Sequence, residues 1–438
     1  MKTQTDSAGK DTASSAGENA LTVLLLGNGS RECALAEKFH ESPLLKKLYI
    51  SPGNAGTAVY GENTALDISD PEAVGAFCAG NNVDLLVSGP ELPLVLGVAD
   101  TVKAISPHTY VFGPGRAGAR LEGSKVFAKG FMTRHAIPTA PFTVVSKGDN
   151  PEWAIPEATE LPIVLKADGL AAGKGTLIAS TVADARHMLR EMLNGAFGKS
   201  SERVVIEKFM NGPECSVFVM TDGTDYRIFP VAADYKRAHD RNTGPNTGGM
   251  GAVCPVDFAD RTFMQKVRDK IIEPTLRGLR EEGIEYRGII YLGLVCVDGD
   301  PYVLEYNVRM GDPETAPVLA LTKSDILDAF LKTAQGRCRE VFTEYDSGKA
   351  VGVVVASEGY PEQAVTGRKI SIDRLPDGVK ILAGGMIRNG AGELVTSSGR
   401  VCTVVAKGST LAQARRKAYE GVCAIHFNGA WFRTDIAE

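Results

Sequence analysis

A glycine-rich segment with a lysine near each end, residues 166–175, is the first candidate for chemistry in this sequence. Glycine and alanine let backbone N–H groups approach phosphate oxygens closely, and the ammonium groups of Lys166 and Lys174 can neutralise phosphate charge. The spacing of Gly169 and Gly173 is one residue too short for a P-loop, and a strand-like Thr-Leu-Ile-Ala follows. The segment therefore predicts a loop between two antiparallel strands that folds over a nucleotide, with a flexible hairpin and exposed lysines as the alternative.

An acidic residue and an amide stand two positions apart in the strand-like segment 303–309. Residues two apart on a strand point to the same face, so Glu305, Asn307 and Arg309 are expected to project together. The core-facing residues of this strand are then expected to be Leu304, Tyr306 and Val308. Carboxylate and amide oxygens suit Mg²⁺, and a guanidinium can bind an anionic oxygen through two N–H groups. A solvated polar face is the common alternative, but the polar turn at 310–315 would add carboxylates at the strand end.

Polar and glycine-rich sequence also fills residues 234–251, which are too many for a simple turn and are expected to lack regular structure. Within them, residues 244–251 read GPNTGGMG, and successive glycines of this kind form anion-binding nests from backbone amides. Lys236 and Arg237 add positive charge just before this loop. A disordered linker is the alternative, but apolar segments bound the loop on both sides, so we expect it to be held in place.

The fourth candidate is a glycine turn at residues 27–32, between the apolar run 21–26 and a helical pattern from Arg31 to about His40. Strand, glycine turn and helix in this order can hold a phosphate at the amino end of the helix. The dinucleotide-binding fingerprint is incomplete, because Glu32 replaces its third glycine and no acidic residue ends a second strand at the expected place.

A scaffold that brings these segments together is predicted by the apolar runs. Strand-like runs at 21–26, 48–50, 83–87 and 110–112 alternate with helical patterns, which predicts a parallel, doubly wound sheet. Ligands of such sheets lie beyond the carboxyl ends of the strands. Further predicted elements are helices at 121–134, 267–282 and 411–425, and strands at 163–166, 176–179, 204–209, 216–220, 288–297, 301–307, 351–356 and 401–406.

The overall composition argues against several classes of protein. The 438 residues predict two to four domains, and the net charge of −5 argues against a general nucleic-acid binder. Eight cysteines form no CxxC pair and six histidines no HxH or HExxH spacing, which argues against a disulfide framework, a redox dithiol or a histidine-bound metal. We therefore expect free thiols in a reducing compartment.

Targeting and membrane signals are also missing from the sequence. No apolar run reaches the ~20 residues that a membrane helix needs. Residues 1–20 are rich in Ser, Thr, Ala and Gly, carry charges of both signs and lack the apolar stretch of a secretory signal. We expect a disordered tail at 1–20 and a cytoplasmic location.

Taken together and in this order, the motifs resemble the glycinamide ribonucleotide synthetases, also called phosphoribosylamine–glycine ligases, of the ATP-grasp superfamily. No single motif is specific, but the combination is, and it runs from about residue 21 to the C-terminus. The segments that carry the resemblance are 52–57 (PGNAGT), 89–94 (GPELPL), 121–125 (LEGSK), 166–175, 244–252 and 311–315 (GDPET).

The resemblance implies a mixed α/β and α+β fold in four parts. These are an N-terminal doubly wound (pre-ATP-grasp) domain at 21–140, an ATP-grasp pair formed by a flap at 141–210 and a central domain at 211–340, and a small C-terminal α/β domain at 341–438. ATP is expected between the flap and the central sheet.

Roles for single residues follow from the resemblance as well. The ATP-binding residues implied are Lys125, Lys166, Gly173, Lys174, Gly175, Glu207, Lys208 and Phe209. The catalytic residues implied are Lys166, Lys174 and Arg309, and the ligands of Mg²⁺ or Mn²⁺ are Glu305 and Asn307. The residues implied for glycine and the amine substrate are Gly29, Ser30, Arg31, Asn54, Gly56, Thr57, Glu91, Asp234, Lys236, Asn246, Thr247, Gly248, Gly249, Arg309, Asp312 and Glu314.

Two residues depart from the family pattern. The family usually has glycine and histidine where this chain has Ser30 and Cys33, giving GNGSREC instead of GNGGREH. Ser30 adds a Cβ where the backbone is expected to approach phosphate, and Cys33 removes an imidazole near the ribose-phosphate site.

The activity implied by the resemblance is ATP-dependent amide-bond formation between glycine and 5-phosphoribosylamine through glycyl phosphate, a step of purine biosynthesis. The expected partners are these substrates and ATP, without nucleic acid or membrane, in a monomer or small homo-oligomer. Three alternatives are an ATP-grasp enzyme for bicarbonate, formate or another amino acid, a nicotinamide-dependent oxidoreductase, and a non-catalytic nucleotide-binding protein. Residues 244–251 and 309–315 argue against the first, and the missing third glycine argues against the second.

Overall fold

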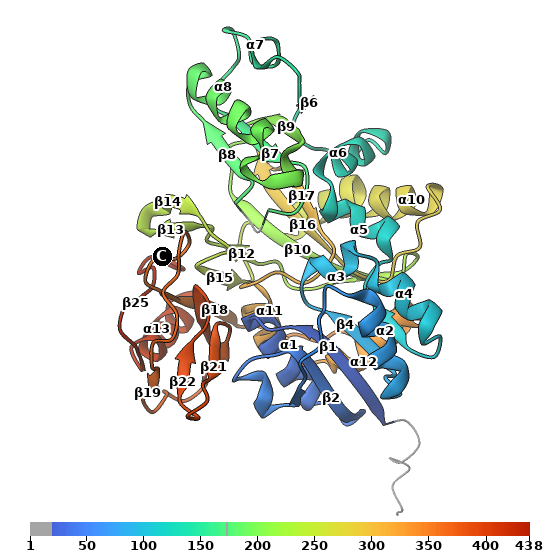
Figure 1. Ribbon diagram of the computed structural model, residues 1–438, viewed down its shortest axis with the longest axis vertical. Coiled ribbons are helices and arrows are strands. Elements are labelled where there is room, and N and C mark those ends of the chain that lie inside the picture. The colour runs from blue at the N-terminus through green and yellow to red at the C-terminus, as the bar shows by residue number, and fades with distance from the viewer. Residues whose placement is uncertain (1–19, 172–173) are drawn as a thin grey trace, which may run out of the picture.

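The computed structural model describes residues 20–171 and 174–438. The expectation of a disordered tail at 1–20 therefore falls outside the described residues, apart from Ala20, and so does the role expected for Gly173. The described residues form four main sheets with their helices (Figure 1). None of the helices in these ranges is both long and apolar enough to cross a membrane.

β1 (Leu21–Gly27) is the middle strand of a five-stranded parallel sheet with the order β3-β2-β1-β4-β5. Val23 and Leu25 are buried in one hydrophobic core, whereas Leu24 and Leu26 are buried in another. Helices cover both faces of the sheet, which explains the continuous apolar run and confirms the doubly wound prediction. The other elements here are β2 (Leu45–Pro52), β3 (Glu62–Asn63), β4 (Leu85–Ser88), β5 (Tyr110–Phe112), α1 (Ser30–His40), α2 (Pro71–Gly80), α3 (Glu91–Val95) and α4 (Val98–Ile105).

The prediction of one helix over 121–134 is wrong. The chain forms two helices, α5 (Arg116–Gly123) and α6 (Lys125–Arg134), separated by Ser124. Ser124 has an extended backbone (φ −144°), and its hydroxyl accepts a hydrogen bond from the Phe127 N–H at 3.1 Å. A serine in this position is a strong N-cap, so it starts a new helix.

A four-stranded antiparallel sheet with the order β6-β9-β7-β8 stands apart from the N-terminal sheet, at the top of Figure 1. It has its own hydrophobic core, which includes Val145, Leu165, Leu189 and Val204. We call this unit the flap. Its elements are β6 (Phe142–Ser146), α7 (Pro151–Ala154), β7 (Ile163–Ala167), β8 (Thr176–Ala179), α8 (Val182–Glu191) and β9 (Arg203–Lys208). Residues 168–175 link the antiparallel pair β7 and β8, as predicted.

The central sheet has four antiparallel strands in the order β11-β10-β16-β17. Its strands are β10 (Glu214–Thr221), β11 (Tyr226–Ile228), β16 (Gly288–Val297) and β17 (Asp300–Asn307). The predicted hairpin is confirmed, and Asp298 and Gly299 at its turn have φ values of 50° and 79°. α9 (Arg261–Val267) continues through a π-helical turn (Arg268–Ile272) into α10 (Glu273–Glu281), so the predicted helix begins six residues earlier than expected.

A register shift in β17 changes which side chains face the core. Glu305 pairs with Gly293, but Leu294 pairs with Val303, so Leu304 is an extra residue in this strand. Val303 is fully buried in the core, whereas Leu304 lines a cavity. The prediction that Leu304 faces the core is therefore wrong, because the bulge interrupts the alternation.

The prediction that residues 234–251 lack regular structure is wrong for most of the segment. β13 (Arg237–His239) and β14 (Thr243–Asn246) form a two-stranded hairpin, while β12 (Ala233–Asp234) and β15 (Gly251–Cys254) belong to a different sheet. Arg241 takes the left-handed conformation (φ 56°) that allows the tight turn. Polar composition concealed β13 and β14, because they are short and are not built around an apolar stripe.

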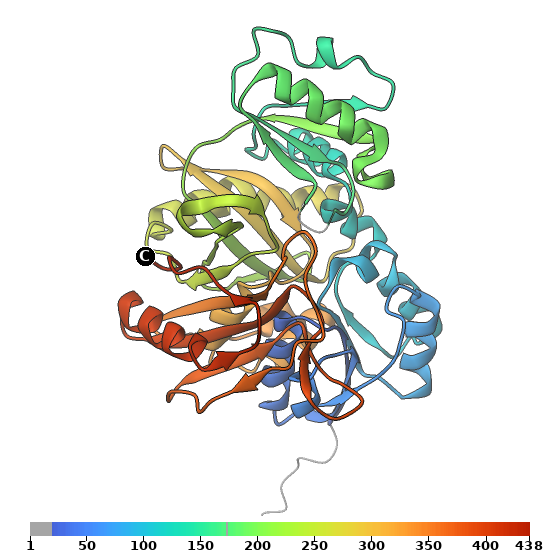
Figure 2. The same ribbon diagram turned by 60° about the vertical axis from the view of Figure 1, so that its left-hand side comes forward.

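β12 and β15 join the C-terminal sheet, whose order is β12-β15-β18-β23-β20 with β25 paired to β18. α13 (Leu411–Val422), the red helix of Figure 2, packs on this sheet. α11 (Thr315–Leu321) also packs on it, and α1 contacts β20 and α11. α12 (Ile326–Ala334) packs against β5 and α1 of the N-terminal region. The remaining elements of the C-terminal region are β18 (Lys349–Ser357), β19 (Ser371–Ile372), β20 (Val379–Ala383), β21 (Met386–Arg388), β22 (Leu394–Thr396), β23 (Arg400–Gly408), β24 (Ile425–His426) and β25 (Ala430–Trp431). The N-terminal, central and C-terminal regions therefore share packed interfaces.

The eight cysteines are all free thiols. Six are buried, Cys296 is partly buried and Cys423 is exposed. This arrangement agrees with the expectation of a chain without a disulfide framework.

Candidate active site

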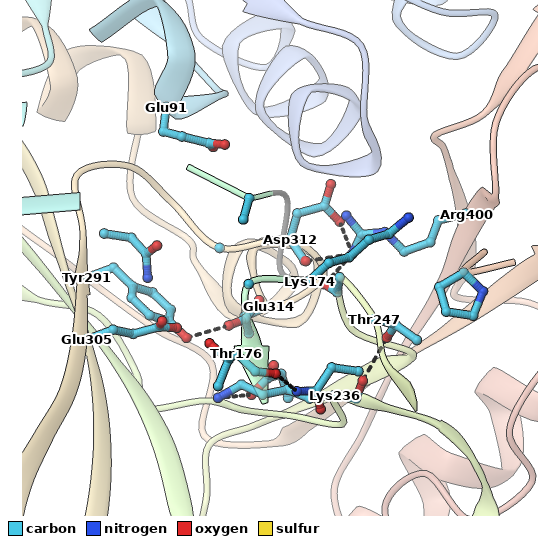
Figure 3. A pocket seen from close by; sticks show the side chains of 18 of the residues that line it. Glu91, Lys174, Thr176, Lys236, Thr247, Tyr291, Glu305, Asp312, Glu314 and Arg400 are labelled. Atoms are coloured by element: carbon cyan, nitrogen blue, oxygen red, sulfur yellow. Dashed lines mark hydrogen bonds and ion pairs between the residues drawn. The ribbon is translucent and has the colours of Figure 1, made fainter. Parts of the chain in front are cut away.

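A cavity of about 1840 Å³ opens where the N-terminal sheet, the flap, the central sheet and the C-terminal sheet meet. Its wall includes the β1–α1 turn, the loop after β7, the end of β17 and the turn after β14. Pockets for single small ligands usually measure about 300–1,000 Å³, so this one has room for a nucleotide and further substrates. Figure 3 shows side chains from separate segments converging on one space, among them Glu91, Lys174, Lys236, Glu305 and Arg400.

The lysines expected to contact phosphate lie on the flap side of this cavity. Lys166 Nζ donates hydrogen bonds to Glu207 Oε2 at 2.9 Å and to the Leu304 carbonyl at 3.0 Å. Lys125 Nζ donates to the Gly169 carbonyl at 3.3 Å, which ties α6 to the loop after β7. The cavity wall contains these members of the expected ATP-binding set: Lys125, Lys166, Lys174, Gly175, Glu207, Lys208 and Phe209.

Lys129 is a cavity-lining residue that the sequence argument missed. Its side chain is 2% exposed, and Nζ lies 3.1 Å from Glu207 Oε1, so Lys129 and Lys166 share one buried carboxylate. Burial lowers the Lys129 pKa to about 8, although the Glu207 charge opposes this shift. The spacing could have revealed it, because Lys125 and Lys129 are four residues apart and share a helix face. The ammonium groups of Lys125, Lys129 and Lys166 outnumber the Glu207 carboxylate, which leaves a net positive charge beside the expected phosphate position.

Glu305 and Asn307 point into the cavity from the same strand, as predicted. Within the described residues, the Glu305 carboxylate accepts no hydrogen bond, whereas Asn307 Oδ1 accepts one from Arg309 Nη2 at 3.2 Å. Burial raises the Glu305 pKa, but the charges of Lys236, Lys166 and other cations outweigh it, and the net shift is downward. An ionised carboxylate next to an amide oxygen fits a hard divalent cation that takes its remaining ligands from water and phosphate.

Within the part of the chain that the structure describes, no larger metal cluster supplements this pair. The described ranges contain no group of three or more His, Cys, Asp or Glu residues arranged to hold a metal ion. A two-ligand protein site agrees with the way Mg²⁺ is bound beside nucleotide phosphates, where the protein gives one or two carboxylates.

Lys236 lies at the centre of a second charged group on the cavity wall. Its Nζ is 2.7 Å from Glu214 Oε2 and 3.8 Å from Asp234 Oδ1. Burial lowers the Lys236 pKa, but the two carboxylates outweigh it and hold that pKa well above its usual value. Glu214 was not predicted from the sequence, since it belongs to no glycine-rich motif, yet it lines the cavity.

Glu314 is another predicted substrate residue on this wall. Its Oε1 accepts hydrogen bonds from Ser216 Oγ and Tyr291 Oη, each at 3.1 Å, and its side chain lies beside Tyr291 in Figure 3. The carboxylate is therefore fixed by two hydroxyl groups of the central sheet.

Arg309 lies at the cavity wall, but its guanidinium is already paired. Nη2 donates to Glu122 Oε1 at 2.6 Å, and Nε donates to Glu91 Oε2 at 3.2 Å. Burial lowers its pKa, but Glu122 and Glu91 outweigh burial and raise it. The residue therefore stays charged, and it links the end of the central sheet to α3 and α5.

The β1–α1 turn brings Gly29, Ser30 and Arg31 to the cavity. Ser30 Oγ donates to the Leu382 carbonyl at 3.1 Å, and Arg31 Nη1 donates to the Met310 carbonyl at 3.1 Å. These bonds fix the amino end of α1 against β20 and against the turn after β17. The Ser30 hydroxyl thus points toward the C-terminal sheet.

Asn54, Gly56 and Thr57 lie behind that turn instead of on the described cavity wall. Asn54 Nδ2 donates to the carbonyls of Asn28 and Ala383, both at 2.8 Å. Asn54 therefore supports the β1–α1 turn from its far side. A direct contact of these three residues with a substrate remains a prediction.

Asn246, at the end of β14, and Thr247 and Gly248 of the loop after it line the cavity, whereas Gly249 is buried behind them. Asn246 Nδ2 donates to the Thr176 carbonyl of the flap at 3.3 Å. Thr247 Oγ1 donates to the Lys236 carbonyl at 2.8 Å. Asp312 completes this side of the cavity (Figure 3).

Arg400 and Tyr360 reach the same side from the C-terminal region and were not predicted. Arg400 Nη1 donates to the Gly248 and Asp312 carbonyls, and Tyr360 Oη accepts from the Gly248 N–H. Neither residue belongs to a motif whose spacing indicates chemistry, so only the folded chain reveals them.

Three family models match consecutive parts of the chain. They are the N domain of phosphoribosylglycinamide synthetase over residues 21–122, its ATP-grasp (A) domain over 123–315 and its C domain over 350–438. A phosphoribosylamine–glycine ligase of Escherichia coli O6:H1 is 42% identical over 423 residues, which are 95% of this chain and 98% of that protein. The chain belongs to the phosphoribosylglycinamide synthetase family.

Other relatives agree with membership of the phosphoribosylglycinamide synthetase family. A phosphoribosylamine–glycine ligase of Yersinia pestis is 42% identical over 426 residues, with 95% of this chain and 98% of that protein covered. The crystal structure of the Thermotoga maritima ligase has a TM-score of 0.83 and 36% identity over 95% of this chain and all of that chain. The predicted fold class and the predicted enzyme class, an ATP-grasp ligase, are therefore confirmed.

Biotin carboxylase from Campylobacter jejuni shares the fold of this chain. Its structure has a TM-score of 0.70 at 16% identity and covers 93% of this chain and 92% of that chain. At this identity the likeness shows the fold alone, and the substrate must be argued from the site.

Proposed function

We propose that the chain joins glycine to 5-phosphoribosylamine and converts ATP to ADP and phosphate, giving glycinamide ribonucleotide for purine biosynthesis. The observation that carries this proposal is that residues of all three matched family domains line one common cavity. Relatives that carry the name phosphoribosylamine–glycine ligase along nearly the whole chain support the choice of substrates.

The first chemical step activates the glycine carboxylate. A bare carboxylate is a poor acyl donor because oxide is a poor leaving group. One carboxylate oxygen attacks the γ-phosphorus of ATP, the bond from that phosphorus to the β–γ bridging oxygen breaks, and ADP departs as glycyl phosphate forms. Lys166, Lys174 and Arg309 oppose the charge that develops on the phosphoryl oxygens. A divalent cation held by Glu305 and Asn307 would neutralise further phosphate charge.

The second step forms the amide. The amine nitrogen of 5-phosphoribosylamine attacks the glycyl carbonyl carbon, the carbon–oxygen bond to phosphate breaks, and the nitrogen loses a proton. The β1–α1 turn and the loop after β14 are our candidates for orienting the amine, because both line the cavity. Orientation of two reactants can supply much of the required rate.

Water must be kept from the glycyl phosphate between these steps. We propose that the flap closes over the cavity, since an acyl phosphate would otherwise be hydrolysed. The contact between Asn246 and Thr176 supports this role, because it joins the flap strand β8 to the loop of the amine side.

ADP release measured with glycine and freshly generated 5-phosphoribosylamine tests the proposal. ADP should form only when both are present, and omission of either should stop it. Release that proceeds with bicarbonate or another carboxylate in place of glycine would favour a different ATP-grasp reaction.

We also propose Mg²⁺ or Mn²⁺ as the cation, and a cytoplasmic monomer or small homo-oligomer as the working state. The ionised Glu305 beside Asn307 supports a hard dication. The free thiols support a reducing compartment. Activity titrations with each cation, and sedimentation of the purified protein, test these points separately.

A further inference from the structure

We propose that Tyr360 and Arg400 are positioning residues that hold the Gly248 peptide and the Asp312 turn in the geometry that catalysis requires. Both come from the C-terminal region, and neither belongs to the strands that bear the phosphate-facing lysines or the metal ligands. The inference rests on the proposed ligase function, which it extends by giving the C-terminal region a defined part in the reaction.

The hydrogen bonds of the Gly248 peptide are the main observation. Tyr360 Oη accepts a hydrogen bond from the Gly248 N–H at 3.0 Å, and Arg400 Nη1 donates one to the Gly248 carbonyl at 2.6 Å. Backbone groups outside regular structure need partners of this kind. Both polar groups of one residue in the substrate loop are therefore held by two side chains of another region.

Arg400 also binds the second substrate segment. Its Nη1 donates to the Asp312 carbonyl at 2.6 Å and lies 3.4 Å from Asp312 Oδ1. Burial lowers the Arg400 pKa, but the charges of Asp312, Tyr360 and Glu314 together outweigh it, so the net shift is upward and the guanidinium remains protonated. One cation thus fixes the distance between the Gly248 peptide and the Asp312 turn.

A side chain at position 248 would displace the Arg400 guanidinium. A Cβ there would lie 2.9 Å from Arg400 Cζ, closer than normal contacts allow, although the Gly248 backbone itself does not lie in the left-handed region. Gly249 has φ 108°, and a Cβ there would lie 2.4 Å from Pro313 Cδ. The loop and the turn therefore touch directly, and Arg400 clamps their contact.

The consequence for catalysis follows from the place of the clamp. Gly248, Asp312, Tyr360 and Arg400 all line the cavity, so a shift of the loop moves groups that face the substrates. A displacement of about 1 Å in an active site can cost about a hundredfold in rate. Loss of the clamp should therefore lower turnover, while nucleotide binding on the flap side is preserved.

Kinetics of matched variants test this inference. Arg400→Met should lower kcat with both substrates by about thirtyfold or more and change the KM for ATP by less than about twofold. Arg400→Lys keeps a charged donor. The logarithm of its kcat should therefore lie at least about a third of the way from the Arg400→Met value back to the wild-type value. Arg416→Ala is the control, because this arginine lies on the outer face of α13 in the same region and is 69% exposed.

A double-mutant cycle separates the clamp from unrelated damage. Gly248→Ala pushes against the Arg400 guanidinium without altering that residue, so it should reproduce most of the loss. Combined with Arg400→Met, it should cost little more than the larger single change, because both remove one interaction. Additive losses, or an unchanged kcat in Arg400→Met, would overturn the inference.

Amide hydrogen exchange gives a readout that does not depend on activity. In Tyr360→Phe the Gly248 amide should exchange about tenfold faster or more, whereas amides of β18 and β23 should be unchanged. Unaltered protection at Gly248 would refute the positioning role. A wild-type protein that fails to turn over glycine and 5-phosphoribosylamine would refute the proposed function instead, and the exchange result would still decide the clamp.

Discussion

Glu122 accepts two hydrogen bonds from adjacent residues of one segment, from the Val308 N–H at 2.7 Å and from Arg309 Nη2 at 2.6 Å. A single carboxylate of α5 thus holds both the main chain and the side chain just beyond the predicted metal ligands. Glu122 is buried and the Arg309 side chain is 18% exposed, so water has limited access to this pair.

Glu122→Gln should therefore lower both the free energy of unfolding and kcat. Removing one partner of a buried ion pair typically costs about 3–5 kcal/mol, and we expect a smaller loss here because Glu91 remains paired with Arg309. We expect a lower denaturant midpoint and a kcat reduced by about tenfold to a hundredfold, as Arg309 loses its fixed position. Glu285→Gln is the control, since the Glu285–Lys103 pair is exposed, and exposed pairs contribute about 0–1 kcal/mol. Equal effects of the two substitutions would contradict this prediction.

Lys174→Ala should lower kcat strongly and leave the free energy of unfolding almost unchanged. Lys174 is exposed beside the cavity and forms no ion pair within the described residues, so its removal should change the unfolding free energy by less than about 0.5 kcal/mol. Loss of a cation that opposes charge on the transferred phosphoryl group should lower kcat by about a hundredfold. ADP release and urea unfolding measure the two quantities. Lys199→Ala, another exposed lysine of the flap region, should leave both unchanged, and a rate in Lys174→Ala equal to the wild type would remove this residue from the mechanism.

Glu305→Gln should weaken the response to divalent cations. A chelator should stop ADP release, and excess Mg²⁺ should restore it in the wild type. In the variant, the Mg²⁺ concentration for half-maximal rate should rise by about tenfold or more, because an ionised ligand becomes a neutral amide. Calorimetric titration of Mg²⁺ in the presence of an unreactive ATP analogue checks binding without turnover. Glu72→Gln, on the exposed first turn of α2, should show the wild-type response, and an unshifted titration in Glu305→Gln would exclude this carboxylate as a ligand.

The Lys129 pKa predicts a pH dependence of stability. Its folded value of about 8 lies below its unfolded value of 10.5, so the unfolded chain binds more protons between these limits. Stability from this group therefore rises with pH across that window, by roughly 2 kcal/mol between pH 7.5 and 9.5. Denaturant unfolding of the wild type and of Lys129→Met measures it as the difference between the two pH profiles. Parallel profiles would show that Lys129 does not titrate there.

Much of the N-terminal fold was predictable because its signals are local. β1 is apolar on both faces, and a glycine turn and a helix follow it, so one strand indicated a sheet covered by helices on two sides. The glycine-rich loop between β7 and β8 was predictable for the same reason, since its flanking strands are adjacent in sequence.

The remaining errors come from contacts between distant segments. Nothing in the local pattern distinguishes Leu304 from its neighbours, because the bulge depends on pairing with Gly293 and Leu294. Arg400 resembles any strand-initiating arginine until the chain folds and brings Gly248 and Asp312 to it. Site residues that act through hydrogen bonds across regions therefore escape a sequence reading based on motifs.

The separate hydrophobic core of the flap has a thermodynamic consequence. Val145, Leu165 and their neighbours stay buried inside the flap whether it lies over the cavity or away from it, because they pack on one another. Lifting the flap chiefly breaks polar contacts, such as those of Lys166 with Leu304 and of Asn246 with Thr176. Exposure of apolar surface is what gives unfolding its large heat capacity change. The opening step should therefore show a heat capacity change far smaller than unfolding of the flap, and its equilibrium should vary only gently with temperature.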